Sequence, residues 1–99
     1  MKFKELINEG VNKSFDKNVK ELVKMGYAVS EDHSGEFATT LFDKKFEVKI
    51  TLHVESPEII ITVEPKNALI NKVPSSERSK YTGSELTLKN FKALKEFLK

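Results

Sequence analysis

The first 26 residues carry an apolar side chain at every fourth position, a spacing typical of a helix. The series consists of Phe3, Ile7, Val11, Phe15, Val19 and Val23. Because four residues exceed one 3.6-residue turn, such a stripe drifts by about 40° per step around a straight helix. The spacing therefore predicts a helical region over residues 1–26 that either bends around a twisted sheet or, as we prefer, breaks within residues 10–14. Gly26 is expected to end it, because glycine readily takes the left-handed conformation that stops helices.

From residue 27 the hydrophobic period changes to two, which is the spacing of a half-buried strand. Its clearest stretch is residues 45–55, in which apolar and polar residues alternate. The apolar positions there are Phe46, Val48, Ile50, Leu52 and Val54. We predict an antiparallel meander of three to four strands over residues 27–65, with residues 27–31 as the optional short strand.

Short turns on both sides of this strand set the expected register. A two-residue turn places Leu41 opposite Phe46, and a four-residue loop places Val54 opposite Ile59. Both registers put every large aliphatic residue of the meander except Ile60 on one face. Because a shift of one residue would turn the whole apolar set to the other face, this agreement supports the meander.

The last third of the chain is polar and then helical in pattern. Residues 66–86 are predicted to be a polar loop, although Leu86 and Leu88 equally fit the start of a short edge strand. Thr87 is expected to cap a C-terminal helix over residues 87–99. Together the segments predict a single α+β domain over residues 1–99, of the order α-β-β-β-(β)-α, with both helical regions packed on one face of the sheet.

Several classes of chemistry are excluded by residue types. The 99-residue chain has no cysteine and two histidines, so it has no disulfide, no thiolate nucleophile and no Cys-based zinc site. Its four glycines are isolated, and no serine lies in a nucleophile-elbow pattern. We therefore predict no catalytic residues, no cofactor and no metal site.

The lengths of the apolar runs in the sequence indicate the cellular compartment. No apolar run approaches the roughly 18–20 residues needed to span a bilayer, and the first five residues are too charged for the apolar core of a signal peptide. A cytoplasmic protein without a membrane partner is the expectation.

Charge is distributed unevenly along a chain of net charge +2. Residues 1–26 carry six lysines against four acidic residues, residues 27–65 carry three against eight, and residues 66–99 carry eight basic residues against three acidic ones. The basic C-terminal third supplies the candidate partner-binding residues. They are Lys66, Lys72, Arg78, Lys80, Tyr81, Lys89 and Lys92.

Three functions remain open. The first is a small non-enzymatic binding protein, an accessory or inhibitor protein of a phage or mobile element that acts on a host protein complex. Small size, the lack of site chemistry and lysine usage typical of AT-rich genomes favour it. The alternative is a nucleic-acid-binding module in which the basic third follows a phosphate backbone and Tyr81 stacks on a base. The third is a homo-oligomeric structural protein joined through a free sheet edge or through the face that carries Phe42 and Ile60.

Overall fold

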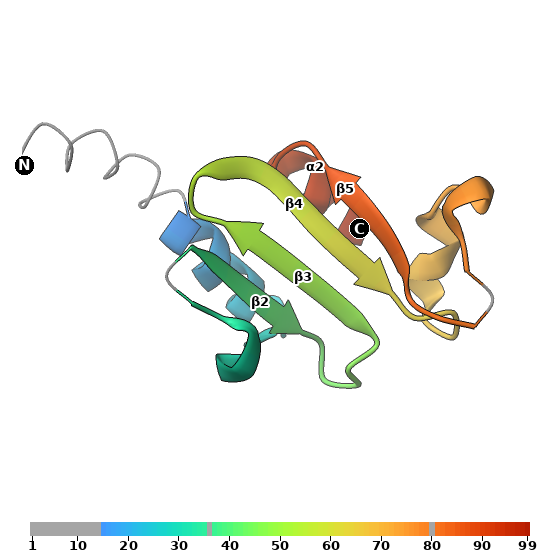
Figure 1. Ribbon diagram of the computed structural model, residues 1–99, viewed down its shortest axis with the longest axis horizontal. Coiled ribbons are helices and arrows are strands. Elements are labelled where there is room, and N and C mark those ends of the chain that lie inside the picture. Colours follow the sequence, from blue (N-terminus) through green and yellow to red (C-terminus); the bar gives the residue numbers. More distant parts are fainter. Residues whose placement is uncertain (1–14, 36, 80) are drawn as a thin grey trace, which may run out of the picture.

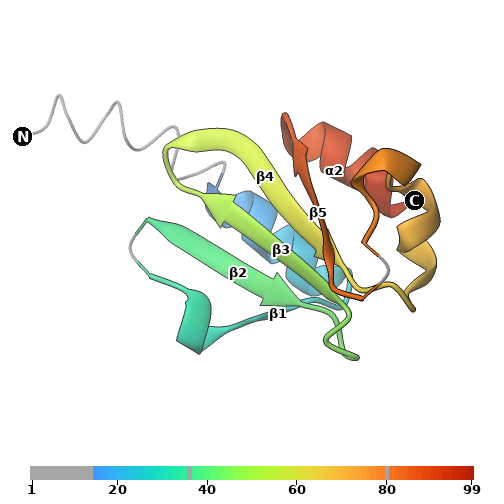
Figure 2. The ribbon, with the colours of Figure 1, turned by 45° about the vertical axis from the view of Figure 1, so that its right-hand side comes forward.

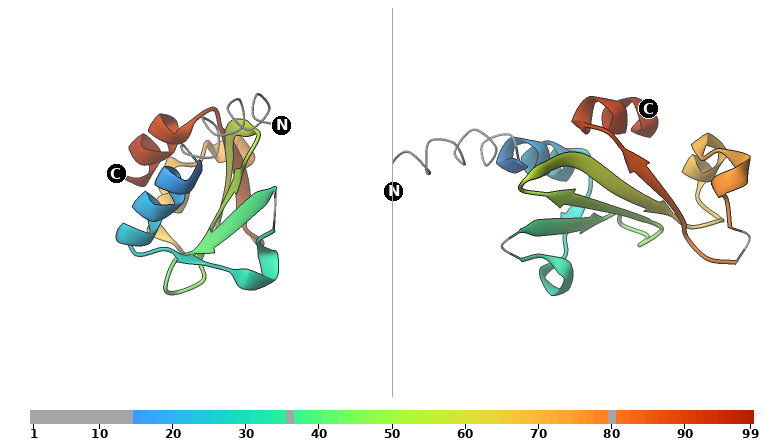
Figure 3. Two further views of the ribbon diagram at one scale, coloured as in Figure 1. Left: turned by 90° about the vertical axis from the view of Figure 1, so that its left-hand side faces the viewer. Right: turned by 45° about the horizontal axis from the view of Figure 1, so that its top comes forward.

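The computed structural model describes residues 15–35, 37–79 and 81–99. They form two layers: one five-stranded antiparallel sheet, and an N-terminal and a C-terminal helix that both lie on one face of it (Figures 1 and 3). The predicted α+β fold with both helices on one face is confirmed. The predicted break within residues 10–14 lies outside the described residues.

The N-terminal helix covers residues 15–24 of the described chain and ends as expected at Gly26. Gly26 has a φ of 107°, in the region that glycine tolerates best. Its N–H donates to the carbonyl oxygen of Val23 at 3.1 Å, and the N–H of Tyr27 donates to that of Leu22 at 3.1 Å. This pair of bonds is the Schellman arrangement, which satisfies the last carbonyls of the helix and turns the chain toward the sheet.

The strands follow one another in the sheet in the order of the chain, as Figure 2 shows. They are β1 (Ala28–Val29), β2 (Ala38–Phe42), β3 (Val48–His53), β4 (Ser56–Val63) and β5 (Ser84–Leu88). Among the described residues the sheet thus has five strands, so the expected three to four is corrected. The optional strand within residues 27–31 is present as β1, and the edge-strand alternative for Leu86 and Leu88 is confirmed as β5.

The predicted polar loop over residues 66–86 is wrong in its extent. Two short 3₁₀ helices, η2 (Ala68–Lys72) and η3 (Ser75–Glu77), occupy its middle, and β5 takes its end. Asn67 caps η2, because its side-chain oxygen accepts a hydrogen bond from the N–H of Leu69 at 3.0 Å. The segment orders because Val73 is buried in the core.

Both predicted registers are shifted, yet the predicted face is correct. Leu41 pairs with Ile50 instead of Phe46, and Ile59 pairs with Leu52 instead of Val54. The first turn is longer than two residues, and β4 begins earlier than expected, after an irregularity in the pairing of β3. Since both registers differ from the prediction by an even number of residues, each side chain keeps its face.

The core lies between the sheet and the helices. Most of its buried side chains come from the N-terminal helix, from β2, β3 and β4, and from the C-terminal helix α2 (Phe91–Leu98), and Val73 joins them from the connection between η2 and η3. They include Leu22, Leu41, Ile50, Ile61, Val63 and Leu94. Each contributes roughly 1.5–3 kcal/mol of transfer free energy, and together they hold both helices against the sheet.

The C-terminal helix begins later than predicted. Thr87 is part of β5, where it pairs with Ile60, and so does not cap the helix. Asn90 takes that role, with its side-chain oxygen accepting a hydrogen bond from the N–H of Ala93 at 2.8 Å. Asparagine is among the best residues for this position, so the correction follows ordinary capping chemistry.

The sheet face opposite the helices, here called the open face, is rich in threonine. One row across the strands is Thr40, Thr51, Ile60 and Thr87. The hydroxyl groups of Thr40 and Thr51 lie 3.0 Å apart and share a hydrogen bond. The short helix η1 (Glu31–His33) lies beside β2 on this side of the sheet (Figure 3, left).

A pH effect on stability is expected from Tyr27. Burial raises the pKa of its phenol, and the nearby carboxylate of Asp43 raises it further. Stability from a raised pKa is fully present below the unfolded value of about 10 and is lost as pH rises through the folded value. We expect Tyr27→Phe to flatten the loss of stability above about pH 10, measured by urea denaturation across that range. Tyr81→Phe is the control, because that side chain is 91 % exposed; equal behaviour of the two variants would contradict the prediction.

Candidate functional site

Two of the predicted partner-binding cations, Lys72 and Arg78, form hydrogen bonds within the chain. The Nζ of Lys72 donates a hydrogen bond to the carbonyl oxygen of Phe97 at 2.9 Å, near the end of α2. The guanidinium group of Arg78 donates to the carbonyl oxygens of Val73 at 2.7 Å and Asn71 at 3.0 Å. A cation at a helix C-terminus satisfies the last carbonyls and complements the helix dipole. Lys72 and Arg78 therefore close the η2–η3 segment and the end of α2.

The other predicted residues do not gather into one patch. Lys66 lies 3.7 Å from the carboxylate of Glu47, and Lys80 lies outside the described residues. Tyr81 is almost fully exposed. Lys89 and Lys92 are exposed at the start of α2, about 10 Å of helix away from the end that Lys72 caps. Lys72 thus lies near the C-terminal end of α2, and Lys89 and Lys92 lie near its N-terminal end.

The structure instead joins the lysines of α2 to those of the N-terminal helix. The two helices lie side by side over the sheet (Figure 3, left). Lys95 of α2 connects them through an ion pair of 2.8 Å with Glu21, and its Nζ lies 6.0 Å above the ring of Phe91. We call the outer side of this layer the basic helix face. Its lysines are Lys17, Lys20, Lys24, Lys92, Lys95 and Lys99.

Charge is segregated between this layer and the rest of the domain. Residues 15–25 and 91–99 carry six lysines against three acidic residues. Residues 26–90, which hold the sheet and its connections, carry eight basic residues against ten acidic ones. Like charges collected on one face raise the local potential there, so the helix layer attracts anions.

A groove of about 520 Å³ runs between the two helices. Lys17, Lys92, Lys95 and Lys99 line it, together with Glu21 and Glu96. The hydrogen bond from Lys95 lowers the pKa of the Glu21 carboxyl against the opposing effect of desolvation, and the positive charges of Lys95, Lys17 and Lys24 lower it further. Lys99 pairs with Glu96 at 3.4 Å. In the described part of the chain, Lys17 and Lys92 have no carboxylate within ion-pair distance, so they are the cations of the groove most available to a ligand.

The contribution of the N-terminal helix was missed by sequence reasoning. Lys17, Lys20 and Lys24 recur at helical spacing on the side away from Phe15 and Leu22, and that signal was available. A residue pattern does not show which helix packs beside which in the folded chain. The basic helix face exists because two segments 70 residues apart in the chain pack together.

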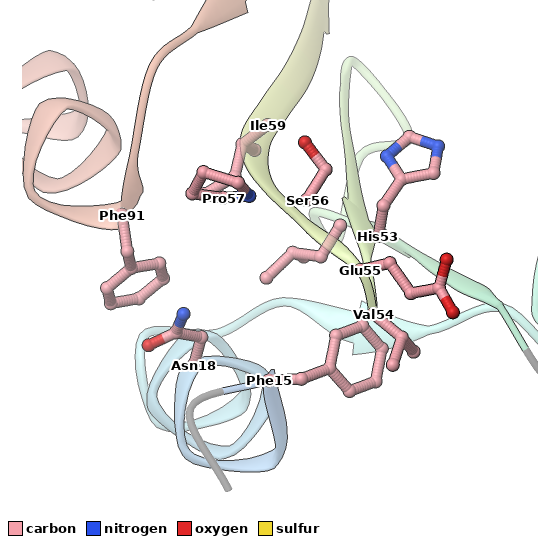
Figure 4. A pocket seen from close by; sticks show the side chains of 10 residues that line it. Phe15, Asn18, His53, Val54, Glu55, Ser56, Pro57, Ile59 and Phe91 are labelled. Carbon is pink, nitrogen blue, oxygen red and sulfur yellow. The ribbon is translucent and has the colours of Figure 1, made fainter. Parts of the chain in front are cut away.

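A second cavity, of about 310 Å³, opens between the first described turn of the N-terminal helix, the β3–β4 turn and the start of α2 (Figure 4). Phe15, Pro57 and Phe91 line it, with Asn18 as a polar neighbour. The imidazole of His53 projects away from its centre (Figure 4). Across the described residues no group of three or more His, Cys, Asp or Glu side chains is placed to hold a metal ion. Most of the lining is apolar; Glu55 also borders the cavity, and its carboxylate, like the imidazole of His53, points away from the centre (Figure 4).

Comparisons with protein-family models, with curated proteins and with solved structures found no match. In residues 15–35, 37–79 and 81–99, no helix has the length and apolar content to cross a bilayer.

Proposed function

We propose that this protein is a non-enzymatic binding module that holds nucleic acid against its basic helix face. The observation that supports the proposal is the segregation of six lysines from two distant segments onto one face, around the groove between the helices. Lysine is a strongly hydrated point charge on a flexible stem, and it neutralises phosphate without demanding a fixed geometry.

The expected mode of binding is electrostatic and insensitive to sequence. Lysines that neutralise phosphates release condensed counterions, so affinity falls steeply as salt rises. Contacts of this kind position a protein on the backbone, whereas base edges are read mainly by arginine, asparagine and glutamine. The chain has one arginine, Arg78, and its guanidinium group is bound to backbone carbonyls. Arg78 is therefore not expected to read bases.

The test is fluorescence anisotropy with short single- and double-stranded DNA and RNA, at about 50 and 200 mM salt. Lys17→Glu/Lys92→Glu removes the two groove lysines that have no ion-pair partner in the described part of the chain. We expect it to weaken binding about tenfold or more at the lower salt, and to lower the slope of log affinity against log salt by roughly 2. The matched control is Lys44→Glu/Lys66→Glu, which changes the net charge equally on other surfaces and is expected to lower affinity by less than about threefold.

Two results would contradict the proposal. Equal losses in the two double variants would show that only net charge matters and that the helix face is not a site. No binding at the lower salt by the unmodified protein would leave these lysines as solvated surface.

The other function expected from the sequence, an accessory or inhibitor protein of a phage or mobile element that acts on a host protein complex, stays a prediction. The described residues show no feature that is specific to a host protein. We prefer nucleic acid as the ligand because the lysines of the basic helix face can bind its phosphate groups.

A further inference from the structure

The β2–β3 hairpin holds an exposed phenylalanine in an unfavourable backbone conformation. Phe46 has a φ of 57°, and among the described non-glycine residues it is alone in having a positive φ. A bulky side chain in this region is rare, because its Cβ crowds the backbone, and glycine or asparagine normally takes such a position. The side chain of Phe46 is also 72 % exposed. Within the chain, Phe46 has one ring contact, with Phe42, and most of its side chain faces solvent.

Phe46 is continuous with the open face of the sheet. Its ring lies against Phe42 of β2, with the ring centroids 5.6 Å apart and the planes tilted by 45°. Phe42 stands on the open face, in a row with Lys49, Thr62 and Glu85, and the charged side chains of Lys49 and Glu85 are both exposed. In the neighbouring row Thr40 is buried, Thr51 and Ile60 are half-buried, and Thr87 is exposed. The hairpin and this face thus form one surface, with Phe46 at its end.

Charges of opposite sign lie at opposite ends of this surface. Lys44 and Lys45 are exposed at the hairpin tip, where β2 ends. Glu31 and Asp32 are exposed on η1, which runs beside the first half of β2, as the hydrogen bond from the N–H of Ser30 to the carbonyl oxygen of Thr40 shows. In Figure 1 the hairpin extends beyond the end of β2, and η1 lies alongside the strand. The surface therefore complements a copy of itself turned end to end.

We propose that two copies of this chain pack open face to open face, about a two-fold axis that crosses the strands. Each Phe46 then packs on the other copy, and Lys44 and Lys45 of each copy face Glu31 and Asp32 of the other. Two-fold symmetry uses the same patch twice, so one self-complementary surface suffices. Two sheets that pack face to face form an ordinary sandwich. The basic helix faces point outward from this dimer, so the inference goes beyond nucleic-acid binding and does not depend on it.

The first test is the molar mass of the full chain, measured by sedimentation equilibrium over a range of concentrations without nucleic acid. We expect a reversible dimer. Phe46→Asn keeps a residue that tolerates the positive φ, so the variant should fold while its dimer dissociation constant rises about tenfold or more. Tyr81→Asn removes a still more exposed aromatic ring from a different turn, and it should leave the dimer unchanged. A monomer at every concentration, or equal effects of the two substitutions, would overturn the proposal.

A charge exchange tests the orientation of the two copies. Lys44→Glu/Lys45→Glu gives a surface that is acidic at both ends, and Glu31→Lys/Asp32→Lys gives one that is basic at both ends. Each variant alone is expected to dimerise more weakly than the unmodified protein, because like charges then face each other. An equimolar mixture is expected to form a heterodimer at least as tight as the unmodified dimer, and to weaken as salt rises. A mixture that stays as weak as its components would overturn the end-to-end arrangement.

Discussion

Replacing Leu94 with alanine is expected to lower the free energy of unfolding by about 2–5 kcal/mol, the range for removing a leucine side chain from a packed core. Leu94 is 0 % exposed and is the one buried residue of α2. The neighbouring α2 residues are only partly buried or exposed, so the helix has no second anchor of this kind. Urea denaturation followed by circular dichroism measures the change. The expected loss is a large share of the total stability of a domain this small.

Lys92→Ala is the matched control for this substitution. Lys92 is an exposed residue on the same helix, and surface substitutions usually change stability by less than about 0.5 kcal/mol. Similar losses in both variants would mean that α2 is not held to the sheet through its buried side. The control also separates the two roles of the helix, because Lys92→Ala removes a cation of the groove without disturbing the core.

Replacing Asp43 with alanine is expected to cost about 3 kcal/mol, since hydrogen bonds to charged groups contribute about 1.5–3 kcal/mol each. The Oδ1 atom of Asp43 accepts hydrogen bonds from the N–H groups of Glu47 at 2.7 Å and Val48 at 2.9 Å. These bonds close the hairpin loop that contains Lys44, Lys45 and Phe46. Faster hydrogen exchange at the Glu47 and Val48 amides, together with a lower urea midpoint, is the measured outcome.

Asp43→Asn separates the effect of the hydrogen-bond acceptor from the effect of its negative charge. The asparagine oxygen still accepts both hydrogen bonds, so this variant is expected to retain more than half of the stability that Asp43→Ala loses. A loss as large as that of Asp43→Ala would assign the effect to the negative charge. Unchanged exchange in Asp43→Ala would show that the hairpin closes without its side-chain acceptor.

The hydrophobic pattern predicted the faces of the sheet better than its register. Alternation along β3 places Val48, Ile50 and Leu52 on the core side, and all three are buried there. The pattern has a period of two residues, so it cannot distinguish registers that differ by an even number. The true length of the first turn is determined by the side chain of Asp43 and by the positive φ of Phe46, and neither leaves a periodic signal.

The segment over residues 66–86 shows the same limit in a polar region. Its order depends on Asn67 as a cap, on two carbonyls that accept from Arg78, and on one buried residue, Val73. Composition alone indicates a loop. A polar side chain that forms a hydrogen bond to the backbone is the same residue type as one that faces water, so the sequence does not distinguish them. The alternation at Leu86 and Leu88 indicated a short edge strand as the alternative to a loop, and the pairing of β5 with β4 confirms the strand.

The predicted partner-binding residues stay a prediction, and the structure adds the surroundings of four of them. Lys89 and Lys92 are exposed near the start of α2. Lys72 and Arg78 donate to the carbonyl oxygens of Phe97 and Val73, and in sequence such side chains are indistinguishable from free ones. Lys17 was missed, since adjacency of the first and last helices is a property of the packed molecule.

Within the described residues, the surplus of lysine on the helix layer and of acidic residues toward the sheet also gives an electric dipole, with its positive end at the helices. The field of a polyanion exerts a torque on such a dipole before any contact is made. Collisions are then biased toward the orientation in which the helices arrive first, so a larger fraction of encounters is productive. In the proposed binding to nucleic acid, the separation of charge between the two layers is therefore expected to raise the rate of association over distances of about a Debye length, 8–10 Å near physiological salt, and this effect should fade as ionic strength rises.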